Sequence, residues 1–251
     1  MLNKALVLAF VLLTQGIAYG QTADEMIEQA KSLEKQMKEA PALSLYKDVL
    51  KIQPDNLTAL IAASEICSRE GYRTTDKDER LKDYNDAKAY AEQAVRLAPE
   101  NADANYVMAM AMGRQALIAG AKEKVTAARE VKRYADLAIK FNPNHAKAYH
   151  VLGRWNYEMV NLSTLEKTAA KLLFGGLPEG SLQEAINNYE KCRQLDPSIV
   201  LNYFELAKAY KDNDEQDKCI EVLKKAVGLR NVYPDDANVK VECRKMLDAL
   251  Q

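Results

Sequence analysis

Several kinds of residue that mark other classes of protein are scarce in this chain of 251 residues. It has only 10 Gly, 7 Pro and 4 Phe, and the alternating runs of Val, Ile and Thr that predict β-strands are absent. The 35 basic and 36 acidic side chains give a formal net charge of −1. This net charge does not favour binding to polyanions, so we expect no nucleic-acid partner. Ala, Leu, Lys and Glu are frequent instead, which is typical of helical proteins.

Motifs for catalysis and for cofactor binding are also missing. The patterns GxxxxGK[ST], HExxH, GxSxG and GxGxxG do not occur. The four cysteines form no CxxC pair, and the two histidines, His145 and His150, have no acidic or Cys partner at ligand spacing. We therefore expect no enzymatic activity, no catalytic residue, no cofactor and no metal.

Two features have both a structural and a functional interpretation. Cys192 and Cys219 stand at small-residue packing positions, which favours buried free thiols and leaves a bridge between them as the alternative. The glycine-rich residues 175–180 are interpreted as a turn before a helix with Ser181 and Glu184 as a capping box. The alternative is an anion site at the start of that helix.

The chain does contain a phrase of thirteen residues that occurs four times and ends each time in proline. A small or apolar residue, an apolar or aromatic residue and a small residue precede that proline by twelve, eight and five positions. The sets are Ala42, Tyr46, Val49 and Pro54; Ala87, Ala91, Ala94 and Pro99; Val131, Ala135, Ala138 and Pro143; and Ala185, Tyr189, Cys192 and Pro197. Small residues let helices approach closely and the proline ends the helix, a pattern typical of the second helix of a tetratricopeptide (TPR) repeat.

The phrase predicts an all-α fold, a TPR-like α-solenoid of about five helical hairpins. The expected repeats cover residues 22–54, 57–99, 102–143, 146–197 and 200–233, followed by a capping helix over 236–250. The prolines are 45, 44 and 54 residues apart, more than the TPR period of about 34. The excess falls between the two helices of each repeat, so we expect lengthened helices or loops there.

The N-terminus has the pattern of a secretory signal. Residues 1–4 are positively charged, residues 5–13 are an unbroken apolar run, and Ala18 and Gly20 are the small residues that a signal peptidase recognises. We expect cleavage before Gln21, export to the periplasm and no membrane insertion of the mature chain. An uncleaved N-terminal membrane anchor is the alternative.

A TPR array presents a concave groove that is lined by its first helices. Counting from each proline, we predict that partner-binding side chains lie in this groove: Tyr106, Arg114, His150, Arg154, Tyr157, Phe204 and Lys208. Aromatic residues among arginines are typical of peptide-binding surfaces, so we expect a protein or peptide partner. The Lys and Asn arrangement of TPRs that clamp a C-terminal carboxylate is lacking. As an alternative, Leu172, Leu173 and Phe174 could cap an apolar cavity of a carrier for lipids or small hydrophobic molecules.

Residues 150–210 carry a more specific likeness. The run HVLGRWNY at 150–157, the sequence LFG at 173–175, Pro178 and the segment around Leu206 resemble the regulator of microtubule dynamics protein family, and the similarity extends over roughly residues 84–251. The resemblance implies an all-helical TPR-like domain without enzymatic activity, associated in animals with microtubules and organelle contacts. With the leader, it indicates a bacterial, exported member. An uncleaved leader would instead indicate a membrane-anchored tether for microtubules or organelles.

Overall fold

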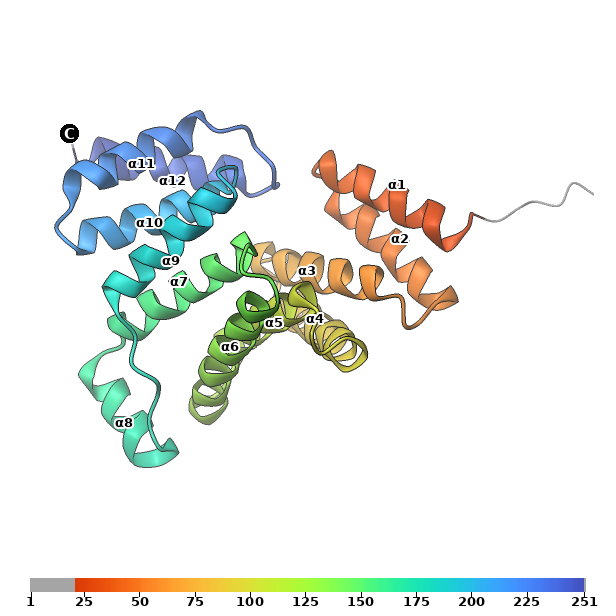
Figure 1. The fold of residues 1–251 in the computed structure, drawn as a ribbon, viewed down its shortest axis with the longest axis horizontal. Helices are drawn as coiled ribbons and strands as arrows, with labels where there is room; N and C mark the ends of the chain where they lie inside the picture. Colours follow the sequence, from red (N-terminus) through yellow and green to blue (C-terminus); the bar gives the residue numbers. More distant parts are fainter. Residues whose placement is uncertain (1–20, 251) are drawn as a thin grey trace, which may run out of the picture.

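The computed structural model describes residues 21–250, which form an all-α, TPR-like solenoid (Figure 1). The expected signal segment, residues 1–20, lies outside the described residues. The described helices are α1 (Ala23–Lys35), α2 (Glu39–Ile52), α3 (Leu57–Arg73), α4 (Lys77–Leu97), α5 (Ala102–Ile118), α6 (Ala121–Phe141), α7 (Ala146–Asn161), α8 (Thr164–Phe174), α9 (Leu182–Leu195), α10 (Val200–Asp212), α11 (Gln216–Gly228) and α12 (Asp236–Asp248). Neighbouring helices pair as hairpins, with α8 inserted between the partners α7 and α9.

The recurring prolines separate one hairpin from the next. Gln53 is the C-cap of α2, and its backbone (φ −128°, ψ 81°) lies outside the helical region that the residue before Pro54 avoids. Two residues later, Asn56 caps α3 by accepting a backbone N–H hydrogen bond of 3.0 Å. The same order recurs after the next two prolines, where Asn101 and His145 cap α5 and α7. Local sequence therefore sets where each of these hairpins ends and the next begins.

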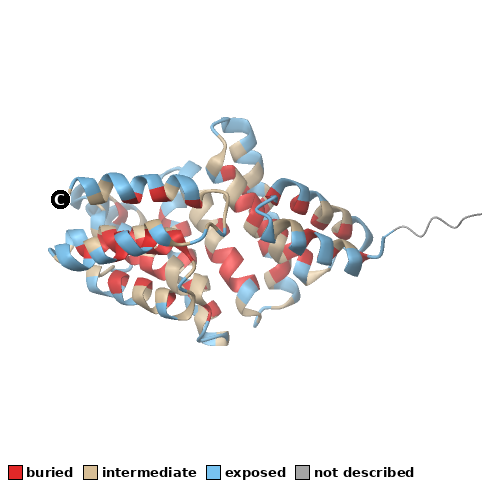
Figure 2. Cartoon of the chain, turned by 90° about the horizontal axis from the view of Figure 1, so that it is seen from above, coloured by how far each residue is buried: buried red, intermediate tan, exposed pale blue. Residues whose placement is uncertain are grey.

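The small and aromatic residues of the repeated phrase form the core, as Figure 2 shows by the buried residues between paired helices. Tyr189 is completely buried against Gly153, where an added Cβ would lie 2.6 Å from a Tyr189 ring carbon. All four cysteines are buried and free, and burial raises the pKa of the Cys67 and Cys192 thiols to about 12. The prediction of packing thiols is confirmed, and the bridge between Cys192 and Cys219 is absent.

The extra residues of the long repeats take two forms. Helices α4 and α6 have 21 residues each, against 14 in α2, so the first two insertions lengthen helices. The third insertion is α8, which projects away from the other helices (Figure 1). A capping box of Ser163 and Glu166 begins α8, and Gly175 ends it in the left-handed conformation (φ 76°).

The glycine-rich segment after α8 is a turn held by a neighbouring helix. Arg129 of α6 donates hydrogen bonds to the carbonyl oxygens of Phe174 and Gly176. Ser181 then caps α9 by accepting a hydrogen bond from the Glu184 backbone N–H (3.3 Å), but the Glu184 side chain does not accept one from the Ser181 backbone N–H. The turn interpretation is confirmed, and the predicted capping box is only half formed. Trp155 of α7 donates its indole N–H to Ala128 of α6 (2.7 Å), which ties α7 to α6.

The leucines of α8 do not cover a cavity. Leu172 is 78% exposed and Leu173 is 70% exposed, and Leu165 on the same helix is 79% exposed. The expectation that residues 172–174 cap an apolar cavity is therefore wrong. It fails because α8 projects from the solenoid and packs only its buried Ala170 side inward.

Candidate functional site

The first helices of successive hairpins, α3, α5, α7 and α10, contact one another and bring the predicted groove positions onto one face. We call this the first-helix face. Side chains connect neighbouring helices across it: Lys147 of α7 bonds Glu65 of α3 (2.6 Å), and His150 of α7 lies 3.1 Å from Asn202 of α10. Residues that are far apart in sequence therefore meet here, as Glu65 and Lys147 do across 82 positions.

One half of the face is an ion-pair cluster, made by Glu39, Glu65, Arg69, Arg73, Lys147 and Asp235. Arg69 joins two carboxylates, with its Nε 2.7 Å from Glu39 and an Nη 2.6 Å from Glu65. Burial alone would raise the pKa of Glu65, but the charges of Lys147 and Arg69 outweigh it and lower the pKa to about 2. The charges of this cluster are therefore matched within the chain.

The loop between α11 and α12, residues 229–235, completes this cluster from the other end of the chain. Asp235 accepts a 3.1 Å bond from Arg73, and the Tyr233 ring centroid lies 5.1 Å from the Arg69 guanidinium carbon. Asp236 accepts hydrogen bonds from the backbone N–H groups of Val232 and Tyr233 (2.7 and 2.8 Å), which stabilises the conformation of the loop. Figure 1 shows the loop reaching back toward α3. The chain itself thus occupies this half of the face.

The other half contains the arginine pair, Arg114 of α5 and Arg154 of α7. The Arg114 guanidinium carbon stacks 4.3 Å above the Tyr72 ring, and its buried Nε has no hydrogen-bond partner among the described residues. Burial, followed by the charge of Arg154, lowers the pKa of Arg114 to about 10, so it remains protonated at neutral pH. The nearest carboxylate to Arg154 is that of Glu158, at 3.8 Å.

Two further polar groups surround the arginine pair. Tyr189 is fully buried, and its hydroxyl has no partner among residues 21–250. The His150 ring lies 5.7 Å from the Tyr189 ring. Burial lowers the pKa of His150, which keeps the imidazole neutral at pH 7. The imidazole therefore adds no charge to this part of the face at neutral pH.

The remaining predicted residues divide between the two halves. Tyr106 is only 6% exposed, and its hydroxyl lies 3.4 Å from Glu65, so it sits beside the ion-pair cluster. Next to the arginine pair, the Lys208 ammonium lies 4.9 Å from the Tyr157 ring centroid and 5.9 Å from that of Phe204. The structure thus groups Arg114, His150, Arg154, Tyr157, Phe204 and Lys208 on α5, α7 and α10.

Sequence reasoning did not find the contribution of the last loop. Tyr233 and Asp235 do not occupy any position of the repeated pattern, and Asp235 is 162 residues from Arg73. Only the curvature of the solenoid brings them together. No pattern in the sequence indicates this contact.

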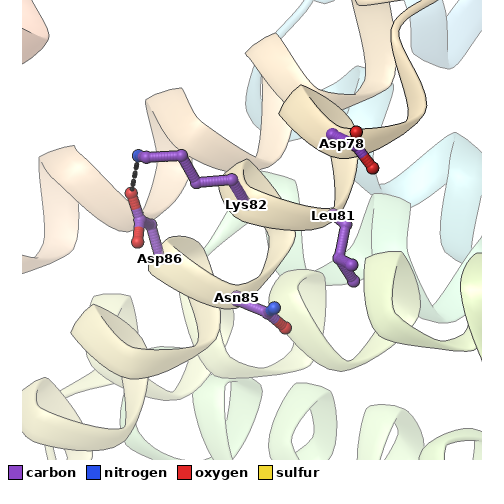
Figure 3. A pocket seen from close by; sticks show the side chains of 5 residues that line it. All are labelled: Asp78, Leu81, Lys82, Asn85 and Asp86. Carbon is purple, nitrogen blue, oxygen red and sulfur yellow. Dashed lines mark hydrogen bonds and ion pairs between the residues drawn. The ribbon is translucent and has the colours of Figure 1, made fainter.

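A surface hollow of about 410 Å³ lies elsewhere, along α4 (Figure 3). It is lined by Asp78, Leu81, Lys82, Asn85 and Asp86, all from one face of that helix. Lys82 and Asp86 pair with each other at 2.6 Å. Because a single solvated helix lines it and its Lys82 is already paired with Asp86, this hollow is a weaker candidate than the first-helix face.

The fold and this face define the class of the protein, an all-α solenoid of the TPR type. A thermophilic TPR protein of Thermus thermophilus superposes with a TM-score of 0.65 at 16% identity, covering 90% of this chain and 99% of that one. The sequence profile of the family described as regulator of microtubule dynamics protein 1-3 matches residues 26–251. The chain belongs to that family.

Relatives in animals share part of their length with this chain. Human regulator of microtubule dynamics protein 2 is 30% identical over 179 residues, which are 71% of this chain and 44% of the human protein. Regulator of microtubule dynamics protein 1 of Caenorhabditis elegans is 25% identical over 174 residues, which are 69% of this chain and 77% of the worm protein. The chain thus spans less than half of the human relative. Between residues 21 and 250, no helix has both the length and the hydropathy to span a bilayer.

Proposed function

We propose that this chain is a non-enzymatic scaffold that binds a protein or peptide partner on its first-helix face. The observation that carries the proposal is the arginine pair, which has unused hydrogen-bond donors and aromatic neighbours on that face. Arginine and tyrosine residues dominate the binding energy of many protein interfaces. The TPR-like fold supports such a role, since these solenoids present long binding surfaces.

The binding region is proposed to lie over α5, α7 and α10 rather than over α3 alone. The ion-pair cluster is matched in charge and covered by residues 229–235, so a partner would have to displace existing contacts there. In contrast, Tyr72 is 52% exposed and the Arg154 side chain is 31% exposed. A partner can therefore reach the arginine pair without breaking an ion pair closer than 3.8 Å.

Selection from a library of random dodecapeptides displayed on phage tests this proposal. We expect the wild-type chain to enrich peptides that bind it, and the double variant Arg154→Ala with Tyr157→Ala to lose them. Helicity should be kept in that variant, and the melting temperature should fall only slightly, because Tyr157 hydrogen-bonds Asp212 (2.6 Å) and packs against the core. Arg133→Ala is the matched control, because Arg133 is 49% exposed and pairs with Glu130 on α6, away from the face. Peptides that bind the double variant as well as the wild type would contradict the proposal.

Membership of the family supports a second candidate, an association with microtubules, because the relatives are named as regulators of microtubule dynamics. Cosedimentation of residues 21–251 with taxol-stabilised microtubules tests it directly. Pelleting that depends on tubulin concentration would support this candidate. Recovery of the chain only in the supernatant would exclude it for this part of the protein.

A further inference from the structure

One charged group of the arginine pair has no ion-pair partner among the described residues. Lys208 pairs with Glu205 at 2.8 Å, and Glu158 lies 3.8 Å from Arg154. Arg114 has no carboxylate of the described chain within 4.0 Å, and the neighbours that act most on its pKa are Arg154 and tyrosines. Lys208 and Arg154 thus each have a carboxylate neighbour, whereas Arg114 has none among the described residues.

An uncompensated guanidinium at a half-buried position is costly, since a desolvated charge is stabilised only by a partner. Elsewhere on the same face the chain supplies such partners: Arg69 has two carboxylates within 2.7 Å, and Arg73 pairs with Glu39 at 2.5 Å and with Asp235 at 3.1 Å. The contrast shows that the fold can pair arginines on this face. The missing partner of Arg114 is therefore a feature of this one place.

We propose that the arginine pair binds the side-chain carboxylate of an Asp or Glu in a peptide partner. This inference rests on the proposed function and names the chemistry that the partner presents. The Tyr72 ring holds the Arg114 guanidinium by stacking, which orients its planar set of N–H donors. A planar carboxylate matches that set of donors, with one negative charge for the one guanidinium that has no carboxylate partner within residues 21–250.

The charge of the ligand also separates a carboxylate from a phosphate. A phosphomonoester carries about −1.5 to −2 charges at neutral pH, more than the one guanidinium of Arg114 beside Glu158 and Glu205 that has no carboxylate partner in the described chain. The surplus negative charge would face those two carboxylates. A single carboxylate leaves no such surplus.

The same dodecapeptide library tests this inference, with composition as the readout. Because the displayed peptides are fused at their C-termini, they carry no free C-terminal carboxylate, and any acidic preference comes from side chains. We expect the wild-type chain to enrich Asp or Glu at one position, and Arg114→Met to lose that preference. A selected peptide should bind Arg114→Met at least about tenfold more weakly, the loss expected for one charge-assisted hydrogen bond. Arg133→Met should bind it as the wild type does.

Replacing the acidic residue of the selected peptide by Gln or Asn should weaken its binding to the wild-type chain. The affinity should fall to that of the unchanged peptide for Arg114→Met, and Arg114→Met should bind the changed and the unchanged peptide equally. Glutarate should compete with the peptide better than inorganic phosphate does at equal ionic strength. Stronger competition by phosphate would overturn the assignment in favour of a phosphorylated ligand. Peptides that bind but show no acidic preference, or bind Arg114→Met equally well, would overturn this inference alone. Failure to select any peptide would overturn the proposed function as well.

Discussion

Replacing Arg114 by Met should stabilise the protein in the absence of a partner. A pKa of about 10 for Arg114 corresponds to roughly 3 kcal/mol of unfavourable free energy for its charged form relative to an exposed arginine. Solvent at the exposed part of the side chain reduces this figure, and losing the stacking on Tyr72 costs about 0.5–1 kcal/mol. We therefore expect a net gain of about 1 kcal/mol in the free energy of unfolding. For a domain of this size, the melting temperature would rise by about 2–4 °C.

Chemical and thermal unfolding followed by circular dichroism measure this effect. The penalty is complete below pH 10, because arginine is protonated in both the folded and the unfolded chain there, so the gain should be equal at pH 6 and pH 8. Arg69→Met is the matched comparison: it leaves the carboxylate of Glu39, whose side chain is 4% exposed, with Arg73 alone and should cost about 2–3 kcal/mol. If Arg114→Met destabilised the chain as much as Arg69→Met does, Arg114 would have a partner within the fold and the reasoning would be refuted.

Three further predictions concern packing, charge and processing. Gly153→Ala should destabilise the chain by about 1–3 kcal/mol in urea unfolding, because the added Cβ would lie 2.6 Å from the buried Tyr189 ring; an unchanged midpoint would contradict this packing. The folded-state pKa of Glu65, about 2, lies below the unfolded value, so its stabilisation is present above about pH 4.3 and is lost as the pH falls toward 2. Glu65→Gln should thus lower the free energy of unfolding, relative to the wild type, more at pH 7 than at pH 3. An equal loss at both pH values would contradict the lowered pKa. Mass spectrometry of the protein from its native host should find a chain that begins at Gln21; a chain that retains the first residues would indicate an anchor.

The helical hairpins were predictable because their determinants are local. Each proline follows a C-cap and precedes the next N-cap by two residues in the first three repeats, as for Pro54 and Asn56. The buried alanines and tyrosines of the phrase, such as Ala42 and Tyr46, recur at the spacing of one helix face. Spacing alone also located the insertions, although it could not distinguish longer helices from the added helix α8.

The repeat register predicted which side chains share one face, but not which groups surround each of them. The repeat register placed Arg114 and Arg154 on the same face, which the structure shows, and it placed Tyr106 there too. The register could not indicate that Tyr106 is buried beside Glu65, or that Arg114 lacks a carboxylate. Both properties depend on which side chains neighbouring helices bring within about 4 Å.

The sequence by itself determined the all-α repeat architecture, because capping, proline placement and helix periodicity act over a few residues. Only the tertiary structure decided how the first-helix face is divided. The curvature accumulated along the solenoid brings Asp235 to Arg73 across 162 residues and pairs the charges of one half, while Arg114 in the other half has no carboxylate partner between residues 21 and 250. Electrostatic matching at such separations depends on distances between whole helices, and no local pattern of residues encodes those distances.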